Sequence, residues 1–316
     1  MTAATQEENM AVTYSYKVAN GVPTKVLTVG DSKLDGECTV PLLVLIPGNP
    51  GIIDYYEEFL KEVYRVCSGA VHVCGVSHGG HCEVADALSS QDISLNSDLY
   101  GLEGQIQHKL CFIDENIPAG RPIFLAAHSI GAYMVLQIME KRPQMHVIRS
   151  ILLFPVFERL SETPSARNLF GRPTLLKAGL WIADRLLTMV PELLKTFFLN
   201  YYFYDLPSKY RTLAQQATLV LLMPNVFRLV FLLAFQELDQ VRERDNQALK
   251  RHLPCLTFYY GSSDSWCPTQ FYAEMKEAFP SGDLHMCMQN LKHAFVLGET
   301  STLSTFVARK VKDSLR

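Results

Sequence analysis

A serine lies at the junction between an apolar run and a run with helical spacing, where it could act as a nucleophile. The run PIFLAAH leads directly into Ser129, and GAYMVLQIMEKRP follows one residue later. A strand–Ser–helix turn lifts the hydroxyl above a sheet, and small residues two positions before and after the serine let the turn pack. Gly131 meets this requirement, whereas Ala127 stands where a glycine is usual. The segment alone predicts either a nucleophile or a serine that only caps the helix.

Two further groups that nucleophilic catalysis requires follow later apolar runs. Asp264 lies in GSSDSWCP and His293 lies in NLKHAF, each just after such a run. A histidine can take the proton of a serine hydroxyl, and a carboxylate can orient that histidine. Taken singly, Asp264 is typical of a turn residue that bonds its own backbone, and a lone histidine is more often structural. The order Ser, Asp, His, each after a predicted strand, favours a catalytic triad.

The loop in LIPGNPGIIDYY could bind the negative charge that forms on an attacked carbonyl oxygen. One backbone N–H is expected from the residue after the nucleophile, Ile130, and another from this loop. Pro50 has no N–H, so Asn49 is the expected second donor. Gly48 and Gly51 would let the backbone approach closely. The alternative is a simple tight turn, for which Gly-Asn-Pro-Gly is well suited.

The elements that must position these residues alternate along the chain. Strands are expected at about residues 12–18, 24–30, 41–48, 70–76, 122–128, 147–155, 254–261 and 283–290. Helices are expected at about residues 53–67, 99–117, 131–143, 268–279 and 301–311. This alternation predicts an α/β fold with a mostly parallel central sheet and helices on both faces. Residues 157–253 break it and predict a helical cap, inserted between two parts of one core, residues 1–156 and 254–316.

Composition excludes several classes of function. The chain has 316 residues, 48% of them hydrophobic, and a net charge of −3 without a basic stripe, so nucleic acid is not an expected partner. The N-terminus lacks the basic start and apolar run of a secretory signal. Eight scattered cysteines, with no C-x-x-C pair, predict reduced thiols and no zinc site. We expect no metal and no cofactor.

The motifs PGNPG, GVSHGGH, HSIG, GSSDSWCP and KHAF occur in the order found in the α/β-hydrolase superfamily, which the chain resembles over most of its length. IPGNPGIIDYYEEFL together with AHSIGAY is similar, more narrowly, to the lipid droplet-associated hydrolase family. This resemblance implies the α/β-hydrolase fold and a serine esterase or lipase that acts on neutral lipid esters, with cholesteryl esters as the proposed class. It also implies residence on lipid droplets and the endoplasmic reticulum, at the cytosolic face.

The inserted segment contains apolar stretches that could contact a lipid surface or cover an acyl pocket. The stretch ATLVLLMPNVFRLVFLLAF approaches the roughly 20 residues that span a bilayer, but Pro224 and Arg228 interrupt it. We therefore expect two short helices hinged at Pro224, either at a lipid surface or packed as a cap. Aromatic side chains favour the interface. The residues expected to contact lipid are Trp181, Phe197, Phe198, Pro224, Phe227 and Phe231.

These residues together predict hydrolysis of an ester through an acyl-enzyme. One alternative keeps the triad but makes the protein an acyltransferase or thioesterase, which would favour an acceptor other than water. Another is a weakly active or non-catalytic protein of the droplet surface that regulates lipid storage. Ala127 and Pro50 are the features that favour this second alternative.

Overall fold

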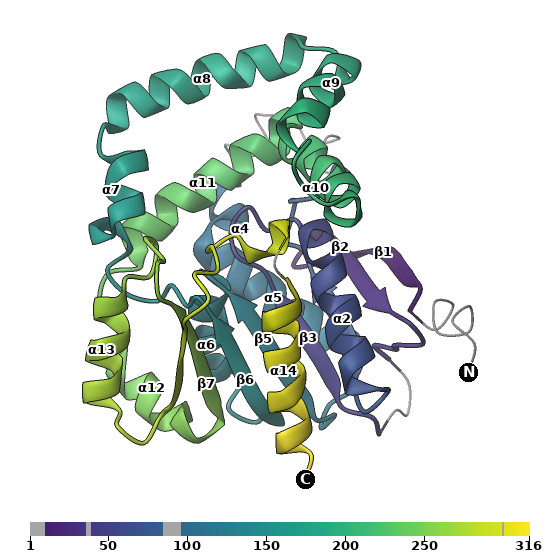
Figure 1. Cartoon of the computed structure of the whole chain (residues 1–316), viewed down its shortest axis with the longest axis vertical. Coiled ribbons are helices and arrows are strands. Elements are labelled where there is room, and N and C mark those ends of the chain that lie inside the picture. The colour runs from purple at the N-terminus through teal and green to yellow at the C-terminus, as the bar shows by residue number, and fades with distance from the viewer. Residues whose placement is uncertain (1–9, 36–38, 85–95, 299) are drawn as a thin grey trace.

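An eight-stranded sheet forms the centre of the computed structural model, which describes residues 10–35, 39–84, 96–298 and 300–316 (Figure 1). The strand order is β1-β2-β4-β3-β5-β6-β7-β8. The strands are β1 Val12–Ala19, β2 Val22–Val29, β3 Leu42–Ile46, β4 His72–Val76, β5 Ile123–His128, β6 Val147–Leu153, β7 Leu256–Gly261 and β8 Asp283–Cys287. β2 pairs antiparallel with β1 and β4, and the pairs from β4 to β8 are parallel. The predicted strands and the mostly parallel sheet are confirmed.

The central strands are mostly apolar because helices cover both faces of the sheet. Every residue of β3, β5 and β7 is buried. Side chains of a strand alternate between faces, so Leu43 and Leu45 pack on one side of the sheet and Val44 and Ile46 on the other. Strand β1, at the antiparallel edge, is largely exposed.

Helices cover both faces of the sheet. Helix α2 (Glu57–Cys67) and α14 (Thr300–Ser314) lie together on the first face, in front of the sheet in Figure 1. Helices α5 (Leu102–Asn116) and α6 (Gly131–Lys141) lie on the second face. Short elements η1 (Ile53–Tyr56) and α4 (Ser97–Tyr100) precede α2 and α5, and α13 (Thr269–Ala278) follows β7.

Six helices connect β6 to β7, and all but the last of them form a cap over the sheet, whereas the last packs against α6. They are α7 Pro164–Phe170, α8 Pro173–Met189, α9 Glu192–Tyr202, α10 Ser208–Leu221, α11 Pro224–Gln240 and α12 Asn246–His252. In Figure 1, α11 crosses directly above the sheet and α8 lies farther out. Helix α11 buries Val226, Leu229 and Leu233, whereas α8 has no buried residue. The division of the chain at residues 157 and 253 stays a prediction.

Helices α10 and α11 are separate and meet at a sharp bend. Helix α11 begins at Pro224, where the hinge was expected, and the two axes differ by 84°. Within the described ranges, no single helix is long and apolar enough to cross a membrane, and this bent pair meets the requirement only by combined length and composition. The seven cysteines at described positions are free thiols. Cys38 and the first nine residues, where no signal was expected, lie outside the described residues.

Candidate active site

Ser129 lies on the sharp turn between β5 and α6, with a backbone φ of 54°. This left-handed conformation is uncommon for a residue with a side chain, and it is the strained turn that exposes a nucleophile. A Cβ at Gly131 would lie 2.5 Å from the carbonyl oxygen of Ile46 and 2.8 Å from that of Pro47, so glycine alone fits there. The methyl group of Ala127 is fully buried at the end of β5. The turn therefore accommodates a methyl group two positions before the serine, at Ala127, but no side chain two positions after it, at Gly131.

The structure brings Ser129, His293 and Asp264 into one hydrogen-bonded chain at the carboxyl ends of β5, β8 and β7. The distance from His293 Nε2 to Ser129 Oγ is 2.9 Å, and that from His293 Nδ1 to Asp264 Oδ2 is 2.6 Å. A carboxylate only accepts, so Nδ1 carries a proton and donates it to Asp264, and the neutral ring accepts from Ser129 through Nε2. This arrangement can remove the proton of the hydroxyl during attack.

Asp264 both closes a turn and faces His293, the two roles that its sequence position suggests. Its side chain has no exposed area. Oδ1 accepts hydrogen bonds from the backbone amides of Trp266 at 2.8 Å and Cys267 at 3.2 Å, which closes the turn after β7. Oδ2 remains for His293. The turn thus fixes the direction of the carboxylate toward the imidazole.

The loop after β3 lies directly against Ser129. A Cβ at Gly48 would be 2.7 Å from the Cβ of Ser129, and Gly51 has a φ of 75° with the ring of His78 packed on its Cα. Both glycines are therefore required by the close approach of the chain. The backbone amides of Asn49 and Ile130 have no acceptor within the described part of the chain, so both are available to a bound group.

The GVSHGGH segment supports this loop from behind. His81 Nδ1 lies 2.5 Å from the carbonyl oxygen of Pro50 and donates to it. Burial lowers the pKa of His81 to about 4, so the ring is neutral at neutral pH. Among the described residues, no three His, Cys, Asp or Glu side chains are grouped so that they could hold a metal ion.

Two residues that the sequence analysis did not single out, Tyr56 and His128, connect the loop to His293. The amide of Gly48 donates to Tyr56 Oη at 3.0 Å, and Tyr56 Oη lies 2.7 Å from His128 Nδ1. His128 Nε2 lies 3.0 Å from the carbonyl oxygen of His293 and must donate to it. Burial lowers the pKa of His128 well below its usual value, so the ring is neutral and Nδ1 accepts from the tyrosine hydroxyl.

Ser129 and His293 open into a largely apolar cavity of about 450 Å³ beneath the cap. Helices α7, α10 and α11 supply its cap side, with side chains that include Phe170, Leu221, Phe227, Val230, Phe231 and Leu238. A cavity of this size lies within the range that holds small apolar ligands. The arrangement suits a substrate with an apolar body and one group that Ser129 can attack.

Glu237 is the one carboxyl group of α11 in this cavity, and the sequence analysis missed it. Its Oε1 accepts from Asn49 Nδ2 at 3.1 Å, and the same amide donates to the carbonyl oxygen of Val230 at 3.0 Å. Burial raises the pKa of Glu237 to about 8, so the group is mostly protonated at neutral pH. These bonds attach the cap to the loop beside Ser129.

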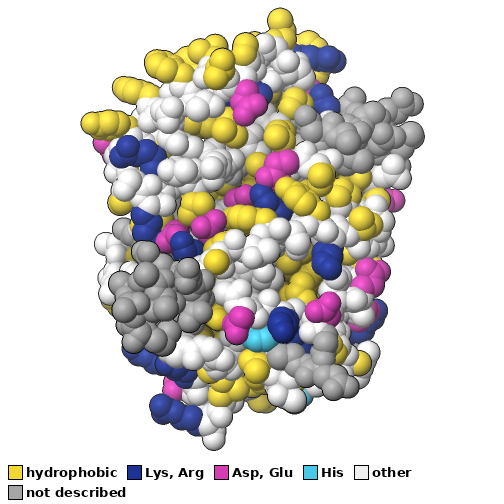
Figure 2. Space-filling model, turned by 90° about the vertical axis from the view of Figure 1, so that its right-hand side faces the viewer, with side chains coloured by type: hydrophobic (Ala, Val, Ile, Leu, Met, Phe, Trp, Pro, Cys, Tyr) yellow, Lys and Arg dark blue, Asp and Glu magenta, His cyan; other side chains and the backbone are white. Residues whose placement is uncertain are grey.

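The residues expected to contact lipid divide into two sets. Trp181 on α8 and Phe197 and Phe198 on α9 are 63%, 64% and 59% exposed. Pro224, Phe227 and Phe231 are half-buried, and the two phenylalanines line the cavity. Apolar side chains gather at the top of the molecule, where α8 and α9 lie (Figure 2).

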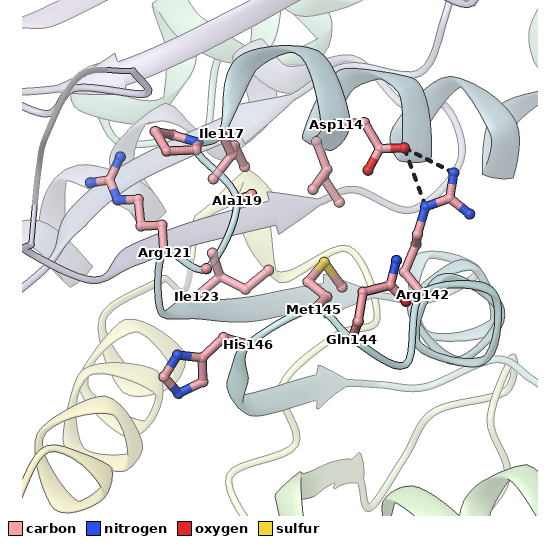
Figure 3. Close-up of a pocket in the computed structure, with 12 residues that line it drawn as sticks. Asp114, Ile117, Ala119, Arg121, Ile123, Arg142, Gln144, Met145 and His146 are labelled. Carbon is pink, nitrogen blue, oxygen red and sulfur yellow. Dashed lines mark hydrogen bonds and ion pairs between the residues drawn. The ribbon is translucent and has the colours of Figure 1, made fainter.

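A second hollow lies at the edge of the sheet where β5 begins. Its lining residues show no arrangement like that of Ser129, His293 and Asp264. It has a volume of about 190 Å³ and is lined by Ile123, where β5 begins, and by Asp114, Arg121 and Arg142 (Figure 3). Asp114 and Arg142 form an ion pair at 2.9 Å. Ser129 lies after the other end of β5, so this hollow is separate from the cavity that contains Ser129 and His293.

Comparison with known proteins agrees with the fold. The model of the family described as lipid-droplet associated hydrolase matches residues 39–296. A lipid droplet-associated hydrolase of Gallus gallus is 33% identical, over 93% of both chains, and one of Homo sapiens is 32% identical, over 98% of both. A haloalkane dehalogenase from Bradyrhizobium elkani superposes with a TM-score of 0.61 at 14% identity, over 96% of this chain and 99% of the other. The structural likeness confirms the α/β-hydrolase fold.

Proposed function

Because the chain belongs to the lipid droplet-associated hydrolase family, we propose that it is a serine hydrolase that cleaves carboxylic esters of neutral lipids. The observation that carries this proposal is the chain of hydrogen bonds from Ser129 through His293 to Asp264 at the floor of an apolar cavity. Such a chain activates a hydroxyl for attack, and the apolar walls favour a substrate with little polarity.

The reaction proceeds in two halves. His293 Nε2 takes the proton of Ser129 as Oγ attacks the ester carbonyl carbon, and the amides of Asn49 and Ile130 donate to the resulting oxyanion. His293 then gives this proton to the leaving alcohol, and an acyl-enzyme remains. Water attacks the acyl carbon while His293 takes its proton, and the carboxylic acid leaves as Ser129 regains its hydrogen. No cofactor enters any step.

The substrate is drawn from lipid esters, with cholesteryl esters as the class suggested by the family resemblance. Apolar side chains make up most of the cavity lining, and the polar ones among them include Asn49, Glu237 and the reacting pair of Ser129 and His293. Such walls fix a preference for apolar chains without selecting one chain length, since each methylene contributes only about 1–3 kcal/mol of discrimination.

The exposed aromatic surface of the cap supports residence at a lipid surface. Trp181, Phe197 and Phe198 present rings to the outside of α8 and α9, where amphipathic side chains settle at an interface. Contact of these helices with a droplet or an endoplasmic reticulum membrane, from the cytosolic side, would place the cavity beneath the cap close to its substrate.

Labelling with a fluorophosphonate tests the nucleophile directly. The native protein should become labelled at Ser129, and both Ser129→Ala and the unfolded protein should not. Absence of label on folded protein would remove the proposal. A single assay with both water and an alcohol present separates the hydrolase from an acyltransferase, since faster transfer to the alcohol would favour the latter. Full retention of the effect on cellular lipid storage by Ser129→Ala would favour a non-catalytic protein.

A further inference from the structure

A groove runs between α8 and α11 on the outer side of the cavity. It has a volume of about 280 Å³, and its apolar walls are Leu180 and Trp181 of α8 and Phe227, Phe231, Leu232 and Phe235 of α11. A charged pair borders it, because Arg228 Nη2 donates to Asp184 Oδ2 at 2.9 Å. Helix α8 has no buried residue, so this ion pair and the groove side chains account for its position over α11.

Two aromatic rings form a wall that the groove shares with the cavity above Ser129. Phe227 and Phe231 line both spaces. They are four residues apart on α11 and therefore lie on one side of the helix, with ring centroids 4.9 Å apart. Both side chains are only half-buried, as expected for rings that border two hollows. A chain that passes from one space to the other must therefore pass these two rings.

The chemistry at Ser129 decides which part of an ester faces this wall. The leaving alcohol must depart beside His293, because His293 Nε2 supplies its proton. Helix α11 lies instead against the loop after β3 that contains Asn49. Asn49 Nδ2 donates to the carbonyl oxygen of Val230, which lies between Phe227 and Phe231 in the sequence. The acyl chain, bonded to the carbon that Ser129 attacks, therefore has α11 in its path.

We propose that the groove between α8 and α11 binds the distal part of a long, unbranched acyl chain, which reaches it from Ser129 past Phe227 and Phe231. This inference rests on the proposed hydrolase function and narrows its substrates to esters of long-chain fatty acids. The groove adjoins α8, whose outer side is exposed and apolar. A chain can thus pass from a lipid surface into the groove without being transferred through water, where each exposed methylene is unfavourable.

Filling the groove with a larger side chain tests the inference. Leu180→Trp and Leu232→Trp each add a ring at groove residues that do not line the cavity above Ser129. Leu186→Trp, at an exposed position of α8 outside the groove, is the matched control. The readout is kcat/KM for p-nitrophenyl decanoate divided by that for p-nitrophenyl acetate, with both below the concentration at which they aggregate. We expect both groove variants to lower this ratio by about tenfold and the control to keep the wild-type ratio.

Binding of cis-parinaric acid to the same proteins tests the groove independently of ester hydrolysis. We expect both groove variants to weaken its binding by about tenfold and the control to match the wild type. Equal selectivity and equal binding in all four proteins would overturn the inference. If the wild type cleaves neither ester, the proposed function fails. Weaker binding of cis-parinaric acid by Leu180→Trp, but not by the control Leu186→Trp, would still support the groove. Leu180→Trp also covers the case in which Leu232→Trp does not fold, because α8 carries no buried residue.

Discussion

His128 Nε2 lies 3.0 Å from the carbonyl oxygen of His293, so the residue before Ser129 holds the backbone of the histidine that faces Ser129. His128 Nδ1 accepts a hydrogen bond from the hydroxyl of Tyr56, and this hydroxyl accepts one from the amide of Gly48. One chain of hydrogen bonds thereby connects the loop after β3 with the backbone of His293. Groups that orient a catalytic residue in this way affect turnover more than substrate binding.

Tyr56→Phe removes the hydroxyl at the middle of this chain. The amide of Gly48 and Nδ1 of His128 are then buried without partners, which should cost about 1–3 kcal/mol in the free energy of unfolding. We expect kcat to fall by about tenfold or more with KM little changed, because alignment rather than binding is lost. Steady-state kinetics and urea unfolding measure both effects.

Tyr64→Phe is the matched control for this variant. Tyr64 lies on helix α2, which begins directly after Tyr56, and its hydroxyl donates to Asp31 at the surface, away from Ser129. Its kinetic constants should equal those of the wild type. Unchanged kcat in Tyr56→Phe would show that the Gly48 and His128 contacts do not align the site.

Asp264→Asn tests the role of the carboxylate that faces His293. Asparagine keeps the shape of the side chain but can present an N–H to His293 Nδ1, which favours the tautomer that no longer accepts from Ser129. We expect kcat/KM to fall by about 10⁴-fold, as for a triad that loses its orienting carboxylate. Asp283→Asn is the control, since Asp283 contacts His285 at the other end of β8 and should leave ester hydrolysis intact. A similar loss in both variants would assign the effect to folding.

Glu237 should make the stability of the protein depend on pH. Burial raises its pKa to about 8 in the folded protein, above that of the unfolded chain near 4.5. Between these values the folded state holds the extra proton, so the free energy of unfolding falls as pH rises, by at most about 1.4 kcal/mol per pH unit from this group. Above pH 8 both states are ionised and this dependence ends.

Glu237→Gln removes this titration while keeping an acceptor for Asn49. Urea unfolding of both proteins at pH 5.5, 6.5, 7.5 and 9 gives the difference in unfolding free energy at each pH. We expect the variant to gain stability relative to the wild type as pH rises to about 8, with no further gain beyond. A difference that stays constant across this range would show that Glu237 is not protonated in the folded protein.

The sequence was sufficient for features that depend on local patterns. Buried strands such as β3 and β5 are continuous apolar runs, and the residues that follow them meet at one edge of a parallel sheet. Because of this geometry, the sequence alone predicts that Ser129, Asp264 and His293 lie close together. The strained turn at Ser129 follows from its strand–Ser–helix context in the same way.

The remaining features depend on contacts between segments far apart in the chain. Tyr56 belongs to the apolar stripe of a predicted helix, and nothing in that stripe shows that its hydroxyl meets His128. Glu237 looks like a surface residue until α11 is packed on the loop of Asn49. Phe227 and Phe231 have the composition of a lipid-contacting helix, and only the packing of α11 turns them toward the cavity.

Helix α9 offers the clearest test of contact with lipid, because its apolar side chains lie outside the cavity and the groove. Leu193, Phe197 and Phe198 are 87%, 64% and 59% exposed, so their replacement by serine should leave the unfolding temperature unchanged. Transfer of one such side chain from water into an apolar phase contributes up to about 1.5–3 kcal/mol. The triple variant should therefore bind triolein droplets coated with phosphatidylcholine at least about tenfold more weakly in a flotation assay, even if burial is partial. Val18→Ser combined with Met288→Ser, both exposed and on other elements, is the control and should float like the wild type. Equal flotation of the triple variant and the wild type would exclude α9 as the lipid-contacting surface.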